Sequence, residues 1–194
     1  RAMNGVTPYP SPDMQELREK AALHYGLLPE CFVFGNGANE LIHALPRALN
    51  LKRAVIPEPA FSEYRLACLC HGVEIDSVPS GEKTSFTPSL AALAERAGTN
   101  HEGEEQETAV FLANPCNPSG GLLDKKELFQ TIKENPGTVW ILDESFIDYT
   151  GGKESLLPDA ATLPNLVILR SLTKFYGMAG VRCGFAVSCA LLAE

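Results

Sequence analysis

The sequence predicts an α/β fold of three layers, in which helices cover both faces of a mostly parallel sheet. Short runs of consecutive apolar residues, without polar residues between them, alternate with helical patterns. Polar residues directly follow several of these runs. Apolar runs of this kind are typical of strands buried on both faces, as in parallel sheets. The length of 194 residues, with 45% hydrophobic and 21% charged residues, favours one globular domain.

Two helical patterns open the chain. Ser11 is expected to cap the first helix, with Pro12 as its first residue and its end near Tyr25, before a glycine. The second helix is expected over residues 37–49, where four apolar side chains recur on one face. Pro46 lies inside this pattern and is expected to kink the helix or end it early.

The rest of the chain continues the alternation. Strands are expected at 54–57, 73–78, 110–113, 139–142, 166–169 and 184–187, and helices at 61–71, 88–97 and 124–134. The polar, acidic stretch 98–107 is expected to be a solvated surface loop.

Polar residues follow three of the predicted strands. They form the segments 114–120, 143–146 and 170–174. In an open parallel sheet, ligands bind beyond the carboxyl ends of the strands. The sequence therefore predicts an active site where these three segments converge.

Composition and charge exclude several functional classes. The net charge of −8 argues against a nucleic-acid partner or an acidic membrane surface. No apolar run approaches the ~20 residues that a membrane span needs, and no charged-then-apolar leader opens the chain. The six cysteines match no zinc spacing, so no metal site is expected. Structural thiols in a reducing cytoplasm are the favoured interpretation.

Five segments, in this order, resemble the fold type I enzymes that use pyridoxal 5′-phosphate (PLP), in the class I/II aminotransferase group. They are Gly35–Glu40, Pro59–Tyr64, Asn117–Gly120, Asp143–Phe146, and Ser171–Lys174 with Arg182 eight residues later. The segments span most of the chain. The resemblance implies a three-layer PLP-transferase large domain that binds PLP.

The resemblance assigns catalytic roles to two residues. Lys174 would form the Schiff base with PLP, although a surface lysine is the ordinary alternative. Asp143 would pair with the protonated pyridine nitrogen and keep the ring an electron acceptor; its alternative is a turn or cap aspartate. Asn117 would bond the ring hydroxyl oxygen, and an Asn-Pro turn residue is its alternative.

The phosphate group would be held at a helix start. There the backbone amides and the helix dipole favour an anion, and a forked guanidinium adds charge-assisted bonds. The residues implied are Gly37, Ala38, Asn39, Ser171, Thr173 and Arg182. A plain strand-to-helix turn and a surface ion pair are the alternatives.

Two aromatic residues complete the implied site. Phe61 would stack on the pyridine ring, and a core phenylalanine is its alternative. Tyr9 would reach the phosphate of the neighbouring subunit's cofactor, so a homodimer is expected.

Within the group, the runs Asp143–Asp148 and Arg170–Tyr176 are most similar to the threonine-phosphate decarboxylases of cobalamin biosynthesis. The sister histidinol-phosphate aminotransferases usually carry tyrosine where this chain has Phe146. Both families act on a small amino-acid or amine phosphate, so decarboxylation and transamination both stay open. A non-catalytic PLP-fold sensor module is the alternative from another class.

The family pattern also implies parts outside residues 1–194. The group normally has an N-terminal arm and a C-terminal small domain with an arginine that binds the substrate carboxylate. Residues 1–194 are therefore expected to be a truncated PLP-binding large domain.

Overall fold

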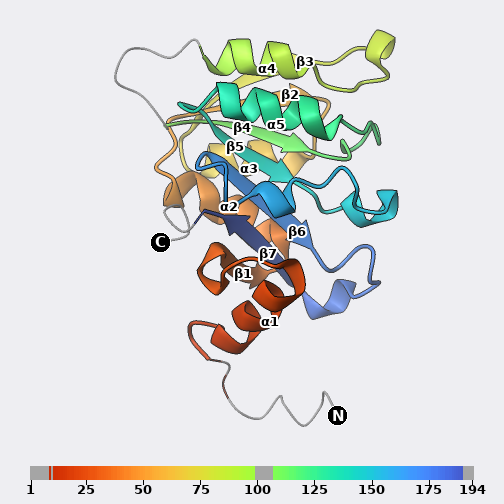
Figure 1. The fold of residues 1–194 in the computed structure, drawn as a ribbon. Coiled ribbons are helices and arrows are strands. Elements are labelled where there is room, and N and C mark those ends of the chain that lie inside the picture. The colour runs from red at the N-terminus through yellow and green to blue at the C-terminus, as the bar shows by residue number, and fades with distance from the viewer. Residues whose placement is uncertain (1–8, 10, 99–106, 190–194) are drawn as a thin grey trace.

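A seven-stranded sheet dominates the computed structural model, which describes residues 9, 11–98 and 107–189. Its strands lie in the order β1-β7-β6-β5-β4-β2-β3 (Figure 1). They are β1 (Phe32–Asn36), β2 (Arg53–Glu58), β3 (Glu74–Pro79), β4 (Thr108–Ala113), β5 (Val139–Asp143), β6 (Leu166–Ser171) and β7 (Cys183–Ser188). Strands β2 to β6 pair in parallel, and β7 is antiparallel to both β6 and β1. The predicted α/β class and mostly parallel sheet are confirmed.

Helices cover both faces of this sheet. They are α1 (Gln15–Tyr25), α2 (Ala38–Ala48), α3 (Ser62–Cys70), α4 (Leu90–Ala97) and α5 (Lys125–Glu134). One buried cluster joins α2 and α3 to alternate strand residues such as Ile56 and Phe111. The other joins α1, α4 and α5 to the intervening residues, such as Val110 and Trp140. Because side chains alternate across a strand, strands β2 to β7 contribute to both cores.

Side-chain caps begin two of the helices. The Ser89 hydroxyl accepts a bond from the Ala92 amide at 3.3 Å, and the Asp124 carboxylate accepts from two amides at the start of α5, each at 2.9 Å. Such caps satisfy amides that have no partner within the helix. The helices predicted at 88–97 and 124–134 are thereby confirmed, within two residues at each end.

The predicted start of the first helix was wrong. Ser11 donates its hydroxyl to the Asp13 carboxylate instead of capping, and residues 11–14 form a turn closed by a 3.0 Å bond from the Met14 amide to the Ser11 carbonyl. Met14 has a φ of 51°, so the helical conformation begins only at Gln15.

Pro46 was expected to kink the helix or end it early, and the early end was wrong. Helix α2 runs two residues past Pro46, to Ala48. Pro46 lies in the last turn, where its missing amide removes a single helical bond. Its carbonyl still accepts from the Leu51 amide at 2.9 Å, which closes the helix end.

Strand β1 has no counterpart in the predicted elements. Its last residues, Gly35 and Asn36, belong to a glycine-rich segment that indicates a turn rather than a strand. In the sheet, Gly35 lies opposite Gly184 of β7. This glycine pair brings β1 to the edge where α2 begins.

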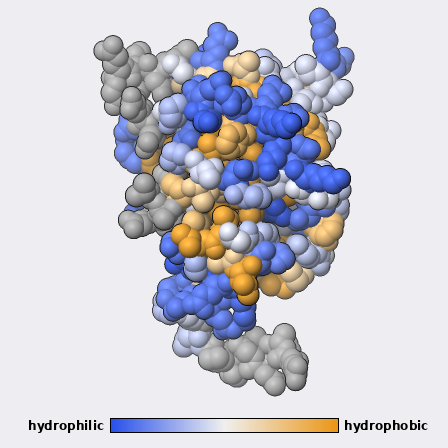
Figure 2. Space-filling model, viewed as in Figure 1, coloured by the Kyte–Doolittle hydropathy of each residue, from blue (hydrophilic) through white to orange (hydrophobic). Residues whose placement is uncertain are grey.

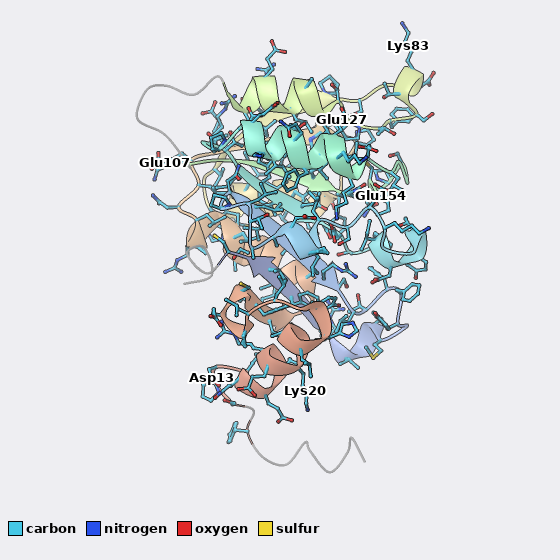
Figure 3. All side chains as sticks on the ribbon, in the orientation of Figure 1. Asp13, Lys20, Lys83, Glu107, Glu127 and Glu154 are labelled. Atoms are coloured by element: carbon cyan, nitrogen blue, oxygen red, sulfur yellow. The ribbon has the colours of Figure 1, made fainter. Side chains whose placement is uncertain are left out.

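The surface is mostly polar on the face shown in Figure 2, where hydrophilic residues cover α4 and α5 and hydrophobic groups gather nearer α1. Charged side chains such as Lys20 and Lys83 project outward (Figure 3). Most of the predicted surface loop at 98–107 lies outside the described residues. Within the described residues, none of the helices combines the length and apolarity that crossing a bilayer requires.

Candidate active site

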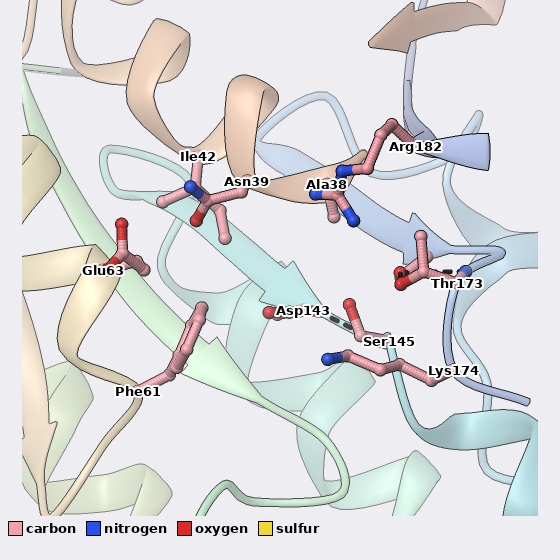
Figure 4. A pocket seen from close by; sticks show the side chains of 11 residues that line it. Ala38, Asn39, Ile42, Phe61, Glu63, Asp143, Ser145, Thr173, Lys174 and Arg182 are labelled. Carbon is pink, nitrogen blue, oxygen red and sulfur yellow. Dashed lines mark hydrogen bonds between the residues drawn. The ribbon is translucent and has the colours of Figure 1, made fainter. Parts of the chain in front are cut away.

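A pocket of about 280 Å³ lies at the carboxyl edge of the sheet, near the lower end of the range for small-molecule sites. Its lining comes from the strand ends and helix starts that meet there (Figure 4). The lining residues are Ala38, Asn39, Ile42, Phe61, Glu63, Asp143, Ser145, Ser171, Thr173, Lys174 and Arg182. Eight of the eleven residues predicted for the site line this pocket, and a ninth, Gly37, contacts the lining residue Arg182. Gly184, which was not predicted for the site, lies against the Ala38 amide at the start of α2.

Asp143 is the last residue of β5 and is 8% exposed. One carboxylate oxygen accepts from the Ser145 amide at 2.9 Å, and the other accepts from the Tyr64 hydroxyl at 2.7 Å. An ionised carboxylate has about four acceptor positions. Asp143 therefore has capacity left for a cationic donor in the pocket, such as a protonated ring nitrogen.

Lys174 follows β6 and extends its ammonium group into the pocket (Figure 4). The Nζ atom lies 5.8 Å from the centroid of the Phe146 ring, within the range of a cation–π contact. Across the pocket stands Phe61, whose ring meets Tyr64 edge to face at 5.6 Å. A flat ligand between Phe61 and Ser145 would be within reach of both Lys174 and Asp143.

The start of α2 provides one side of the pocket. Ala38 and Asn39 lie in its first turn, where amides lack helical partners and favour an anion. Ser171 and Thr173 add two hydroxyls, 2.7 Å apart. Arg182 lies so close that a Cβ on Gly37 would stand 2.8 Å from its Nη2 atom. These donors match the three acceptor oxygens of a phosphate group.

Arg182 holds an uncommon backbone conformation. Its φ is 54°, in the left-handed region that costs a non-glycine residue roughly 1–2 kcal/mol. Its Nη1 atom donates to the Ala179 carbonyl at 3.1 Å, which anchors the guanidinium beside the helix start. Strain of this kind often accompanies ligand binding, and here it places the guanidinium beside Gly37, next to the start of α2.

A buried ion cluster lies beneath the site. Arg170 contacts Glu144 at 3.3 Å and Asp148 at 2.6 Å, and Glu144 is fully buried. Glu144 also accepts from the Ser155 hydroxyl at 2.6 Å and the Leu156 amide at 2.8 Å. Burial raises the pKa of Glu144, and these donors offset part of that rise. The cluster ties the end of β5 to the end of β6, and so Asp143 to the Ser171–Lys174 segment.

Two predicted site residues lie outside the pocket. Asn117 is in a neighbouring hollow of about 360 Å³, which Phe146 and Tyr149 also line. Tyr9 is fully exposed and does not line the pocket. Their roles, toward the ring oxygen and a second subunit, stay predictions. Cys116 adjoins Asn117, and burial raises its pKa to about 11, so it is a neutral thiol at physiological pH.

Sequence reasoning did not single out Ile42, Glu63 or Tyr64. Glu63 lines the pocket and pairs with His43 at 2.8 Å. Tyr64 stands behind the pocket and bonds Asp143. Both belong to the Pro59–Tyr64 segment, but nothing in that segment distinguishes a pocket residue from a core residue. The six cysteines are free, and no group of potential metal ligands occurs among the described residues.

Gly184→Ala should disturb the pocket through backbone contacts. A Cβ at position 184 would stand 2.4 Å from the Ala38 amide nitrogen, whereas Gly180 has no atom within 4 Å of the same position. We expect Gly184→Ala to destabilise the fold by about 1–3 kcal/mol, as overpacking does, and Gly180→Ala to change it little. Chemical denaturation of both variants measures the difference; equal stabilities would contradict the close packing of α2 on β7.

Comparison with known proteins identifies a family and several relatives. The family model "Aminotransferase class I and II" matches residues 1–194. A histidinol-phosphate aminotransferase of Pyrococcus furiosus is 34% identical over 180 residues, 93% of this chain and 49% of that protein. The bifunctional protein CobDQ of adenosylcobalamin biosynthesis in Leptospira interrogans is 31% identical over 184 residues, 95% of this chain and 21% of that protein. The chain thus spans about half, or less, of these relatives.

Solved structures share the fold. The L-threonine-O-3-phosphate decarboxylase of Porphyromonas gingivalis matches with a TM-score of 0.82 and 26% identity, covering 98% of this chain and 54% of that one. The histidinol-phosphate aminotransferase of Sinorhizobium meliloti, solved in complex with PLP, matches with a TM-score of 0.87 and 24% identity, covering 99% and 51%. The second likeness speaks for the fold alone.

Proposed function

Because this chain belongs to the class I and II aminotransferase family, whose members are PLP-dependent enzymes, we propose that its pocket binds PLP and acts on a small phosphorylated amino acid or amine. The observation that carries the proposal is the meeting of Lys174, Asp143 and the α2 anion donors in one pocket. The relatives named above as an aminotransferase and a decarboxylase are enzymes, which supports catalysis over a sensor role.

Four parts of PLP have a matching group in the pocket. Asp143 would hold the ring nitrogen, Phe61 one face of the ring, and Lys174 the carbonyl carbon. The α2 start, Ser171, Thr173 and Arg182 would hold the phosphate. Bound PLP supplies an electron sink for the pair released at the substrate α carbon. Lys174 supplies the amine of the pocket lining that would move a proton to or from that carbon.

Threonine phosphate is the substrate that we favour, with decarboxylation as the reaction. Phe146 lies in the hollow beside Lys174 and carries no hydroxyl, whereas a tyrosine there is the aminotransferase pattern. In this reaction the bond between the α carbon and the carboxylate breaks, carbon dioxide leaves, and a proton replaces it on the α carbon. The product would be aminopropanol phosphate.

Transamination of histidinol phosphate is the second candidate, because the aminotransferase of Pyrococcus furiosus is 34% identical to this chain. The predicted homodimer and the N-terminal arm and C-terminal small domain beyond residues 1–194 also remain proposals.

The deciding experiment gives the full-length protein threonine phosphate and, separately, histidinol phosphate with 2-oxoglutarate. We expect carbon dioxide and aminopropanol phosphate from the first substrate and no glutamate from the second. Glutamate from the second, without carbon dioxide from the first, would replace decarboxylation by transamination. Turnover of neither substrate, with PLP bound, would refute the proposed substrate class.

A further inference from the structure

Tyr64 lies behind the pocket and contacts two of the residues proposed to hold the cofactor, Asp143 and Phe61. It lies on α3 and is 1% exposed. Its hydroxyl donates to Asp143 at 2.7 Å, across 79 residues of sequence. Its ring meets Phe61 edge to face at 5.6 Å and stacks on Phe111 at 5.6 Å. One side chain therefore contacts both the carboxylate proposed to meet the edge of a flat ligand and the aromatic ring proposed to cover one of its faces.

We propose that Tyr64 is a positioning residue that fixes the Asp143 carboxylate and the Phe61 ring for the cofactor. This inference rests on the proposed PLP site. Phe111 belongs to β4, the strand beside β5, so its ring holds Tyr64 against the sheet next to Asp143. The Ser145 amide fixes the other carboxylate oxygen, and the two donors together define the carboxylate plane.

The Tyr64 hydroxyl is suited to be a permanent donor. Burial raises its pKa well above the ordinary value of tyrosine, and the nearby negative charge of Asp143 raises it further. The phenol is therefore neutral throughout the physiological range. A donor to a carboxylate stabilises the charged form and makes the carboxylate a weaker base. Tyr64 would thus leave the proton on the cofactor ring nitrogen instead of letting it shift to Asp143.

Tyr64→Phe removes the hydroxyl and keeps the ring. In the full-length protein loaded with PLP that carries ¹⁵N in its ring, we expect the ring-nitrogen resonance to move toward the neutral-pyridine position. We also expect PLP affinity to fall about tenfold, since a bond to a charged group is lost. Tyr25→Phe is the matched control, because Tyr25 is a partly buried tyrosine on α1 that packs on Phe32 and Phe185.

The Asp143→Asn background separates positioning from packing. If Tyr64 acts through Asp143, Tyr64→Phe should change PLP affinity in the wild type and leave it nearly unchanged in Asp143→Asn. A second, gentler substitution places 3-fluorotyrosine at position 64, which keeps the ring and makes the hydroxyl a stronger donor. The resonance should then move the opposite way, toward pyridinium.

An unchanged ¹⁵N resonance in both variants, or equal affinity losses in the two backgrounds, would overturn the proposal. Failure of the wild-type protein to bind PLP would instead refute the proposed function itself. The two failures are therefore distinguishable.

Discussion

Replacing Lys174 by alanine should abolish covalent attachment of PLP and lower turnover by at least about a thousandfold, or roughly 4 kcal/mol of activation barrier. Lys174 extends its amine into the pocket, opposite Phe61 and within reach of the ligand that Asp143 would hold. Its loss removes both the imine-forming group and the nearest proton carrier. Borohydride reduction followed by peptide mass spectrometry should find PLP on Lys174 in the wild type and on no lysine in the variant.

Lys153→Ala provides the control, because Lys153 is exposed and does not line the pocket. This variant should keep wild-type turnover and the same labelled peptide. PLP trapped on a lysine other than Lys174 in the wild type would refute the role proposed for Lys174.

Replacing Arg170 by alanine should cost about 3–5 kcal/mol of unfolding free energy, the usual effect of removing one partner from a buried ion pair. Glu144 is fully buried and would lose the cation beside it, while Asp148 would lose its 2.6 Å bond. Because the cluster ties β5 to β6, the variant should also bind PLP more weakly. Urea denaturation of the cofactor-free and PLP-loaded protein measures both effects.

Arg65→Ala is the comparison for this prediction. Arg65 pairs with Glu58 on the surface, and both side chains are close to half exposed, 46% and 47%. Exposed pairs contribute at most about 1 kcal/mol, so Arg65→Ala should change the stability little. Equal losses of unfolding free energy in the two variants would contradict the claim that the buried Arg170 cluster matters more to stability than an exposed ion pair.

The sequence predicted residues that line the pocket where polar side chains directly follow a predicted strand. Asp143, Ser171 and Lys174 follow apolar runs, and parallel strands bring such residues to one edge without any knowledge of their distances. The family resemblance added Phe61 and Arg182, which also line the pocket.

Other features depend on contacts that no local pattern records. Tyr64 resembles any core tyrosine until Asp143 is placed beside it. Strand β1 was missed because its glycine, which would weaken an isolated strand, is matched by Gly184 of β7. Ser11 is a typical cap residue, but the neighbouring Asp13 carboxylate competes for its hydroxyl.

The position of β7 has a consequence for the order in which the protein folds. Strand β1 is made first of the strands, yet its only partner in the described sheet is β7, more than a hundred residues later. During synthesis, β2 to β6 can pair with one another before β7 is made, while β1 still lacks its partner strand. Closing so long a loop slows folding. The corner proposed to bind phosphate would therefore be the last part to assemble, and a nascent chain that ends before Cys183 would lack it.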